Sequence, residues 1–265
     1  MGVKETYPIL KKYAGEPLEL CKRLAPYFPD GEAADVLAYL QSFGMYTSGP
    51  KGAEDANLLK KEEAWETFAD LHETYQKKWD GPNIPILILP HRRVGFFSGG
   101  HHKSGLAFPD KLVLFLSPNL PQKEKEALFI HEYHHVCRLN RQDKKMNHYC
   151  LADSSILEGC AEFAVASILG DESYLAPWTK KYSQPFLESY WNKKFKDAVS
   201  CNRTDPKHDD LLLGKNGHPY MIGYCMGYFL VEQYAEHHTY SIEQSFSMPA
   251  EAFIDFYRKK QDSSE

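Results

Sequence analysis

Long apolar runs are missing from this 265-residue sequence. The most apolar stretches, IPILILP and KLVLFLSP, are far shorter than the ~20 residues that a bilayer-spanning helix needs. The opening segment, MGVKETYPILKKYAGEP, also lacks the continuous apolar core of a signal peptide. We therefore expect a cytoplasmic protein that does not bind membranes.

Closely spaced cysteine pairs and an excess of positive charge are missing too. The six cysteines are scattered and form no C-x-x-C pair, so we expect reduced and mostly buried thiols. Lys and Arg number 31 against 36 Asp and Glu, and the formal net charge is −5. A weakly acidic surface repels phosphate backbones, so we expect no nucleic-acid partner.

Helical patterns fill the first part of the chain. Hydrophobic residues make up 43% of the sequence, which is enough for a substantial core and one or two domains. Apolar residues recur at three- and four-residue spacing in 18–28, 33–43 and 62–79, and this spacing predicts helices. We predict a helical N-terminal region over residues 1–80 and a second domain over 81–265.

The character of the sequence changes after residue 80. Residues 84–90 and 111–116 are apolar and partly β-branched, and they read as buried strands. Residues 92–100 predict a further strand. Helical patterns then return, including 154–170 and 218–237. Strands between two helical regions indicate an α+β protein.

Residues 123–139 predict a helix that carries the pattern His-Glu-x-x-His. His131 and His135 are one turn apart, so their imidazoles lie on the same face. Such a pair can bind zinc, and Glu132 beside it is placed to act as a general base toward water. Because this face is otherwise apolar, its polar groups need partners, and a metal would supply them. His134 points about 100° away and is expected to be a supporting or surface residue, not a ligand.

A catalytic zinc needs a third protein ligand besides the two histidines. The metzincin pattern HExxHxxGxxH is excluded, because Arg138 and Arg141 stand at its Gly and final His positions. A glutamate from the predicted helix 154–170 is the alternative. If that helix runs antiparallel to the first, Glu158 can reach the metal. Glu162, one turn further on the same face, would then lie behind it and orient a histidine.

Each of these residues also has a purely structural interpretation. His131 and His135 could be ordinary half-buried histidines, since short motifs arise by chance. Ser155-x-x-Glu158 fits a capping box, which would give Glu158 a local role. Glu162 could be solvated. The combination favours a metal site, because two carboxylates on an otherwise apolar helix need a reason to be buried.

An HExxH helix followed by Glu-Gly on a later helix resembles the gluzincin peptidases, in which that glutamate is the third zinc ligand. The sequence is also similar to the DUF2268 family of predicted zinc-dependent proteases, including its bacillar YjaZ-like members. The resemblance covers roughly residues 80–240, and the matching segments are KSGLAFPDKLVLFLSP, the helix around HEYHH, ILEGCAEF and HPYMIGYCMGYFLV. It implies an α+β, zincin-like (gluzincin) fold with a small mixed sheet, an active-site helix and helical N-terminal and C-terminal parts.

The resemblance also implies roles for individual residues. The Zn²⁺ ligands and the general base that it assigns are His131, His135, Glu158 and Glu132. In aminopeptidase-type gluzincins, a tyrosine in a Pro-Tyr-x-x-Gly context stabilises the oxyanion. Tyr220 stands in that context here, and Tyr224 is the alternative. Packing at the start of a helix would explain Tyr220 equally well.

These assignments predict a zinc metallopeptidase, a hydrolase that acts on peptide or protein substrates. Zincins bind an extended peptide along an edge strand, and we expect residues 111–116, preceded by GLAF, to be that strand. The alternative is a non-catalytic zinc-binding or protein-interaction module, chaperone-like or regulatory, on the same frame. The intact Glu132 argues against it. Hydrolysis of a non-peptide amide is a third option, because the motif specifies water activation and not the acyl group.

Overall fold

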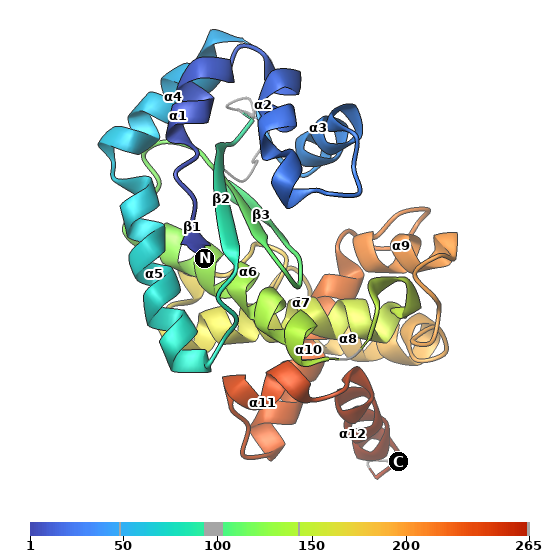
Figure 1. Cartoon of the computed structure of the whole chain (residues 1–265). Helices are drawn as coiled ribbons and strands as arrows, with labels where there is room; N and C mark the ends of the chain where they lie inside the picture. The colour runs from blue at the N-terminus through green and yellow to red at the C-terminus, as the bar shows by residue number, and fades with distance from the viewer. Residues whose placement is uncertain (48, 93–102, 143, 264–265) are drawn as a thin grey trace. The chain divides into compact units, whose positions relative to one another are not determined.

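The computed structural model describes residues 1–47, 49–92, 103–142 and 144–263. It is mostly helical with a small mixed sheet, which confirms the expected α+β class (Figure 1). The chain divides into two compact units, Met1–Val136 and Cys137–Glu265. This division falls inside a helix and not at residue 80, so the expected domains 1–80 and 81–265 stay a prediction.

In the first unit, a run of helices lies between the short strand at the N-terminus and the other strands of the sheet. They are α1 (Tyr7–Tyr13), α2 (Pro17–Leu24), the 3₁₀ turn Ala25–Tyr27, α3 (Ala33–Ser42), α4 (Pro50–Lys61) and α5 (Ala64–Trp79). The predicted helices 18–28, 33–43 and 62–79 are confirmed as α2, α3 and α5. In α5 the apolar spacing buries Trp65 and Phe68 on one face of the helix.

The sheet has the strand order β1-β2-β4-β3. Its strands are β1 (Gly2–Val3), β2 (Pro85–Pro90), β3 (Lys103–Ala107) and β4 (Leu112–Leu116). β2 pairs in parallel with β1 and β4, whereas β3 pairs antiparallel with β4. β2 and β4 are buried almost throughout, which explains why their sequences are continuously apolar and not alternating. The predicted strands 84–90 and 111–116 are confirmed.

One expectation about the sheet is wrong. Residues 111–116 form the inner strand β4, and β3 takes the outer position in the described part of the sheet. The reason is a tight hairpin: the Phe108 amide donates to the Lys111 carbonyl at 2.9 Å and folds β3 back along β4. The predicted strand 92–100 lies outside the described residues except for Arg92, which is in no strand.

The helix α6 (Gln122–Arg141) confirms the prediction for residues 123–139. The helices that follow are α7 (Leu151–Leu169), α8 (Gln184–Tyr190), α9 (Pro206–Leu213), α10 (Ile222–His237), α11 (Ile242–Ser247) and α12 (Ala250–Asp262). Shorter helical turns span Met146–His148, Glu172–Tyr174 and Trp191–Phe195. Gly170 ends α7 in the left-handed conformation, as helix C-caps commonly do.

Two glycines bring α7 and α10 into backbone contact. A Cβ on Gly227 would lie 1.8 Å from the Ser155 carbonyl oxygen, and one on Gly159 would lie 2.3 Å from the Gly227 carbonyl carbon. Both glycines lie inside helices and neither has a positive φ, so conformational freedom is not the reason for them. They are glycines because the helices cross too closely for any side chain.

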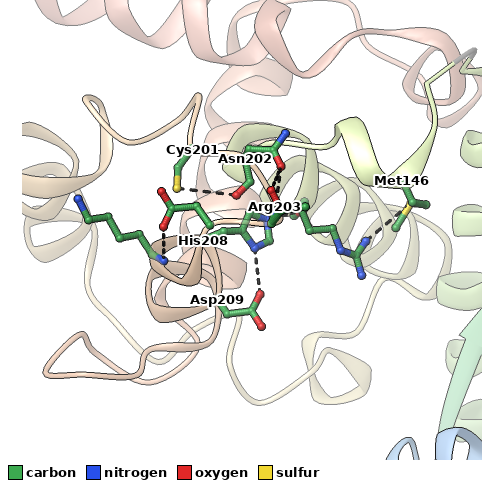
Figure 2. Close-up of polar contacts among 10 residues, drawn as sticks. Met146, Cys201, Asn202, Arg203, His208 and Asp209 are labelled. Carbon is green, nitrogen blue, oxygen red and sulfur yellow. Dashed lines mark hydrogen bonds and ion pairs between the residues drawn. The ribbon is translucent and has the colours of Figure 1, made fainter.

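The polar segment 201–217 is rich in Asn, Asp and Pro, a composition that predicts a loop, but it contains the helix α9. Asp205 caps this helix by accepting from the Lys207 amide at 2.9 Å. Further polar contacts around the same segment are drawn in Figure 2, among them the Arg203 guanidinium on the Met146 sulfur at 3.9 Å. Asn, Asp and Pro are turn-forming residues, but here they start a helix.

The cysteines are free thiols, and four of the six are buried. Burial raises the pKa of Cys21 to about 11 and that of Cys225 to about 12, so neither forms a thiolate at neutral pH. Within the described ranges, no helix combines the length and the apolar character that a membrane crossing requires.

The close crossing of α7 and α10 gives a stability prediction. Gly227→Ala should destabilise the protein by about 3 kcal/mol or more, because the added methyl group meets backbone atoms that cannot rotate away. Gly15→Ala is the matched control, since a Cβ at Gly15 meets nothing within 4 Å. Urea unfolding of the two variants measures the difference, and equal midpoints would contradict the inferred backbone contact.

Candidate metal centre

The aromatic face of α6 fixes how the helix is turned. Phe129 and Tyr133 are fully buried, and their rings stack with centroids 5.3 Å apart. Trp79 at the end of α5 stacks on Tyr133 at 5.9 Å, and the Tyr133 hydroxyl donates to the Pro82 carbonyl at 2.9 Å. Since a helix turns about 100° per residue, this anchoring directs positions 131 and 135 to the opposite side.

The two histidines of the motif meet on that opposite side. The Nε2 atoms of His131 and His135 are 2.9 Å apart, and their rings are nearly perpendicular at 85°. Two nitrogens bound to one tetrahedral zinc lie about 3.3 Å apart, given bonds of 2.0–2.1 Å. The pair therefore needs to open by only ~0.4 Å to chelate a metal, and the donor chemistry fits zinc.

Glu132 lies beside the histidine pair in the first unit. Its side chain is only 8% exposed. It packs against the backbone of Gly105 in β3, where a Cβ would come within 2.4 Å of the Glu132 Cδ. The general-base candidate is thus a largely buried carboxylate held between its own helix and a strand.

Glu158 and Glu162 lie on α7 in the second unit. α7 begins at Leu151, with Cys150 as N-cap and the Asp153 carboxylate accepting from the Cys150 amide at 2.8 Å. The proposed capping box at Ser155 is therefore wrong, because position 155 lies inside the helix and Glu158 has no capping role there. Glu162 is buried, which excludes the solvated interpretation, and it accepts a hydrogen bond from the Ala176 amide at 2.9 Å.

His131, His135 and Glu158 form a candidate metal-binding group. One ligand atom from each residue lies within 4.8 Å of the other two. Two imidazoles and a carboxylate are a donor set found in catalytic zinc sites. The spacing within one helix predicts the two histidines. The glutamate requires the further assumption that the next helix runs antiparallel to the first.

His134 lies apart from the histidine pair. It is fully buried, and its ring packs edge-on against Trp79 with centroids 6.2 Å apart. The expectation that it could be a surface residue is therefore wrong. Its contact with Trp79 gives it a packing role on the flank of α6.

Tyr220 and Tyr224 occupy different environments around the start of α10. The helix begins at Ile222, so Tyr220 precedes it, whereas the prediction placed the helix over 218–237. The Tyr220 side chain is 63% exposed, and its carbonyl accepts from the Tyr182 hydroxyl at 3.0 Å. Tyr224 is half-buried against Trp178, with ring centroids 5.2 Å apart. Exposure leaves the Tyr220 hydroxyl accessible to a ligand, and its role stays a prediction.

A second arrangement that resembles a hydrolase site is not predicted by the sequence. His208 contacts the Ser154 hydroxyl through Nε2 at 2.9 Å. Its Nδ1 lies 3.0 Å from the Asp209 carboxylate (Figure 2). The order Ser-His-Asp matches a catalytic triad. However, His208 is 1% exposed and Ser154 is 7% exposed, so a substrate carbonyl cannot reach the hydroxyl. We interpret these hydrogen-bonding contacts as a structural link that stabilises the packing of α9 against α7.

The comparisons with known proteins point in one direction. The family model described as "Predicted Zn-dependent protease (DUF2268)" matches residues 64–255. The chain is 36% identical over 262 residues to "Uncharacterized protein YjaZ" of Bacillus subtilis (strain 168), covering 96% of this chain and 99% of that protein. It is 25% identical over 157 residues to "Uncharacterized protein YjfC" of the same strain, covering 55% of this chain and 52% of that protein.

No solved structure matches the chain significantly, so the zincin-like assignment stays a prediction. The family model covers well over half of the chain, and the first of these relatives matches it along nearly its whole length. The chain belongs to the DUF2268 family of predicted Zn-dependent proteases.

Proposed function

We propose that this protein is a zinc-dependent peptidase. His131, His135 and Glu158 hold the zinc, and Glu132 is the general base. The observation that carries the proposal is the grouping of these three ligand atoms within 4.8 Å, in a member of a family described as predicted Zn-dependent proteases. A cytoplasmic location and a peptide or protein substrate belong to the same proposal.

The donor chemistry of the three ligands and the burial of His135 and Glu132 support this assignment. Imidazole nitrogens bind zinc in their neutral form, and a carboxylate completes a set of three protein ligands that leaves one position for water. His135 and Glu132 are 6% and 8% exposed, so the groups are largely shielded from bulk water. Shielding strengthens their electrostatic interactions with any charge that develops during a reaction.

The proposed reaction is the addition of water to a peptide carbonyl, followed by cleavage of the C–N bond. Zinc, when bound, supplies Lewis acidity that lowers the pKa of water toward ~7. Glu132 accepts a proton from the attacking water and transfers it to the leaving amine nitrogen. The second proton of the water leaves the new carboxyl group for the amine, so the products are a carboxylate and a protonated amine, and Glu132 returns to its ionised form.

Tyr220 is proposed to stabilise the oxyanion. A phenolic hydroxyl can donate a hydrogen bond to the oxygen on which negative charge develops. Its exposed side chain, on a turn just before α10, is compatible with contact to a substrate. Tyr224 is the alternative donor. Glu162 is proposed to support the ligand group by orienting a histidine from behind.

The rival proposal is a zinc-binding module without catalysis. Such a module would need the ligands but would not need Glu132. Glu132 is buried next to the two histidines in the sequence of α6, where a general base would be needed, so its position favours the catalytic proposal. Hydrolysis of a non-peptide amide uses the same groups, and only substrate screening separates it from peptide hydrolysis.

Glu132→Gln tests the general base. Hydrolysis of casein or of a peptide library by the zinc-loaded protein should fall by about 10²–10⁴-fold, because the amide cannot accept the proton. The zinc content should stay at the wild-type level, since Glu132 is not a ligand. Glu73→Gln, on the exposed surface of α5, is the matched control and should leave hydrolysis unchanged. Stoichiometric zinc without hydrolysis of any substrate by the wild type would favour the non-catalytic module.

Glu158→Gln tests the third ligand. Zinc affinity, measured by competition with a chromogenic chelator, should fall by at least about 100-fold, because the neutral amide is a poor zinc ligand. Glu162→Gln should cost less, on the order of 10-fold, as expected for a supporting residue. Full zinc affinity in the Glu158 variant would show that the third ligand is another residue.

A further inference from the structure

Gly105 occupies an ordinary strand position. It lies in the middle of β3 and pairs with Leu114 of β4. Its φ is not in the left-handed region, so a residue with a side chain could adopt the same backbone conformation. Glycine weakens a strand relative to residues with side chains, so its presence here needs another explanation.

The explanation lies in what a side chain at this position would meet. A Cβ on Gly105 would lie 2.4 Å from Cδ, 2.5 Å from Cγ and 2.7 Å from Oε1 of Glu132. Real Cβ atoms essentially never make contacts under 3.0 Å. All three atoms belong to one side chain, which is itself only 8% exposed. Glu132 thus fills the space that the missing side chain leaves.

We propose that Gly105 is a positioning residue for the general base. Its lack of a Cβ lets the Glu132 carboxylate stand directly over the strand β3, and the strand backbone limits how far the carboxylate can turn. The catalytic part of this inference rests on the proposed function. The steric part does not, because both residues belong to the first unit and their contact is independent of zinc.

The inference assigns a function to a residue outside the HExxH motif. A methyl group at position 105 would force the Glu132 carboxylate out of its place or push β3 away. Displacement of a catalytic group by ~1 Å can cost about 100-fold in rate. The three atoms nearest to this methyl group all belong to Glu132 and none to a histidine of α6, so we expect the metal site to be retained.

Gly105→Ala tests the catalytic part in the zinc-loaded protein. We expect kcat on a peptide substrate to fall by about 10–100-fold, with KM changed by less than about 3-fold, because the affected group acts in the chemical step. Zinc content should equal that of the wild type. Gly15→Ala is the matched control, since a Cβ at Gly15 meets nothing within 4 Å. Unchanged kcat in an active enzyme would overturn the inference.

A double-mutant cycle on stability tests the steric part without any activity. Gly105→Ala should lower the melting temperature by about 3 °C or more when Glu132 is present. In a Glu132→Ala background the same substitution should have little or no effect, because the space is then empty. Equal shifts in the two backgrounds would overturn the inference.

The two experiments separate this inference from the proposed function. A coupled stability cycle in a protein that hydrolyses no substrate would support the contact and contradict the peptidase. An active, Glu132-dependent peptidase with no coupling would support the peptidase and contradict the role of Gly105.

Discussion

The rotational setting of α6 is the constraint on which the candidate site depends. At about 100° per residue, Phe129 and Tyr133 point some 120–160° away from His131 and His135. Packing of the two aromatic rings against α5 therefore directs the histidines to the other side. Glu132 projects between these two faces, where it meets β3. Three faces of α6 thus have three roles: the aromatic face packs against α5, Glu132 meets β3, and the histidine face carries two candidate metal ligands.

On α7, three buried or half-buried carboxylates stand among apolar residues, and each has a different task. Asp153 accepts from the Cys150 amide and from the Lys144 ammonium at 2.6 Å, which fixes the start of the helix. Glu162 accepts from the Ala176 amide and holds the segment after the helix. Glu158 is the one with a ligand atom within 4.8 Å of those of His131 and His135, and it is our proposed third zinc ligand. A buried acid on an apolar helix is therefore not by itself a sign of metal binding.

Features that depend on local geometry were predictable from the sequence. The histidine pair follows from one helical turn, and the buried strands follow from continuous apolar runs. Features that depend on pairing between distant segments were not. β1 has only two residues and gains its place by pairing with β2, and the outer position of β3 depends on a hairpin. α9 was missed because its capping residues look like a loop in the sequence.

Glycine shows why a motif search alone cannot complete such a site. Gly170 and Gly214 end helices at positive φ, a role that sequence position suggests. Gly105 and Gly227 have ordinary backbone conformations, and only the neighbouring atoms explain them. The neighbour of Gly227 is a helix backbone, and the neighbour of Gly105 is the Glu132 carboxylate. Gly105 extends the candidate site from the HExxH helix to the strand beside it, because β3 as well as α6 sets the space available to Glu132.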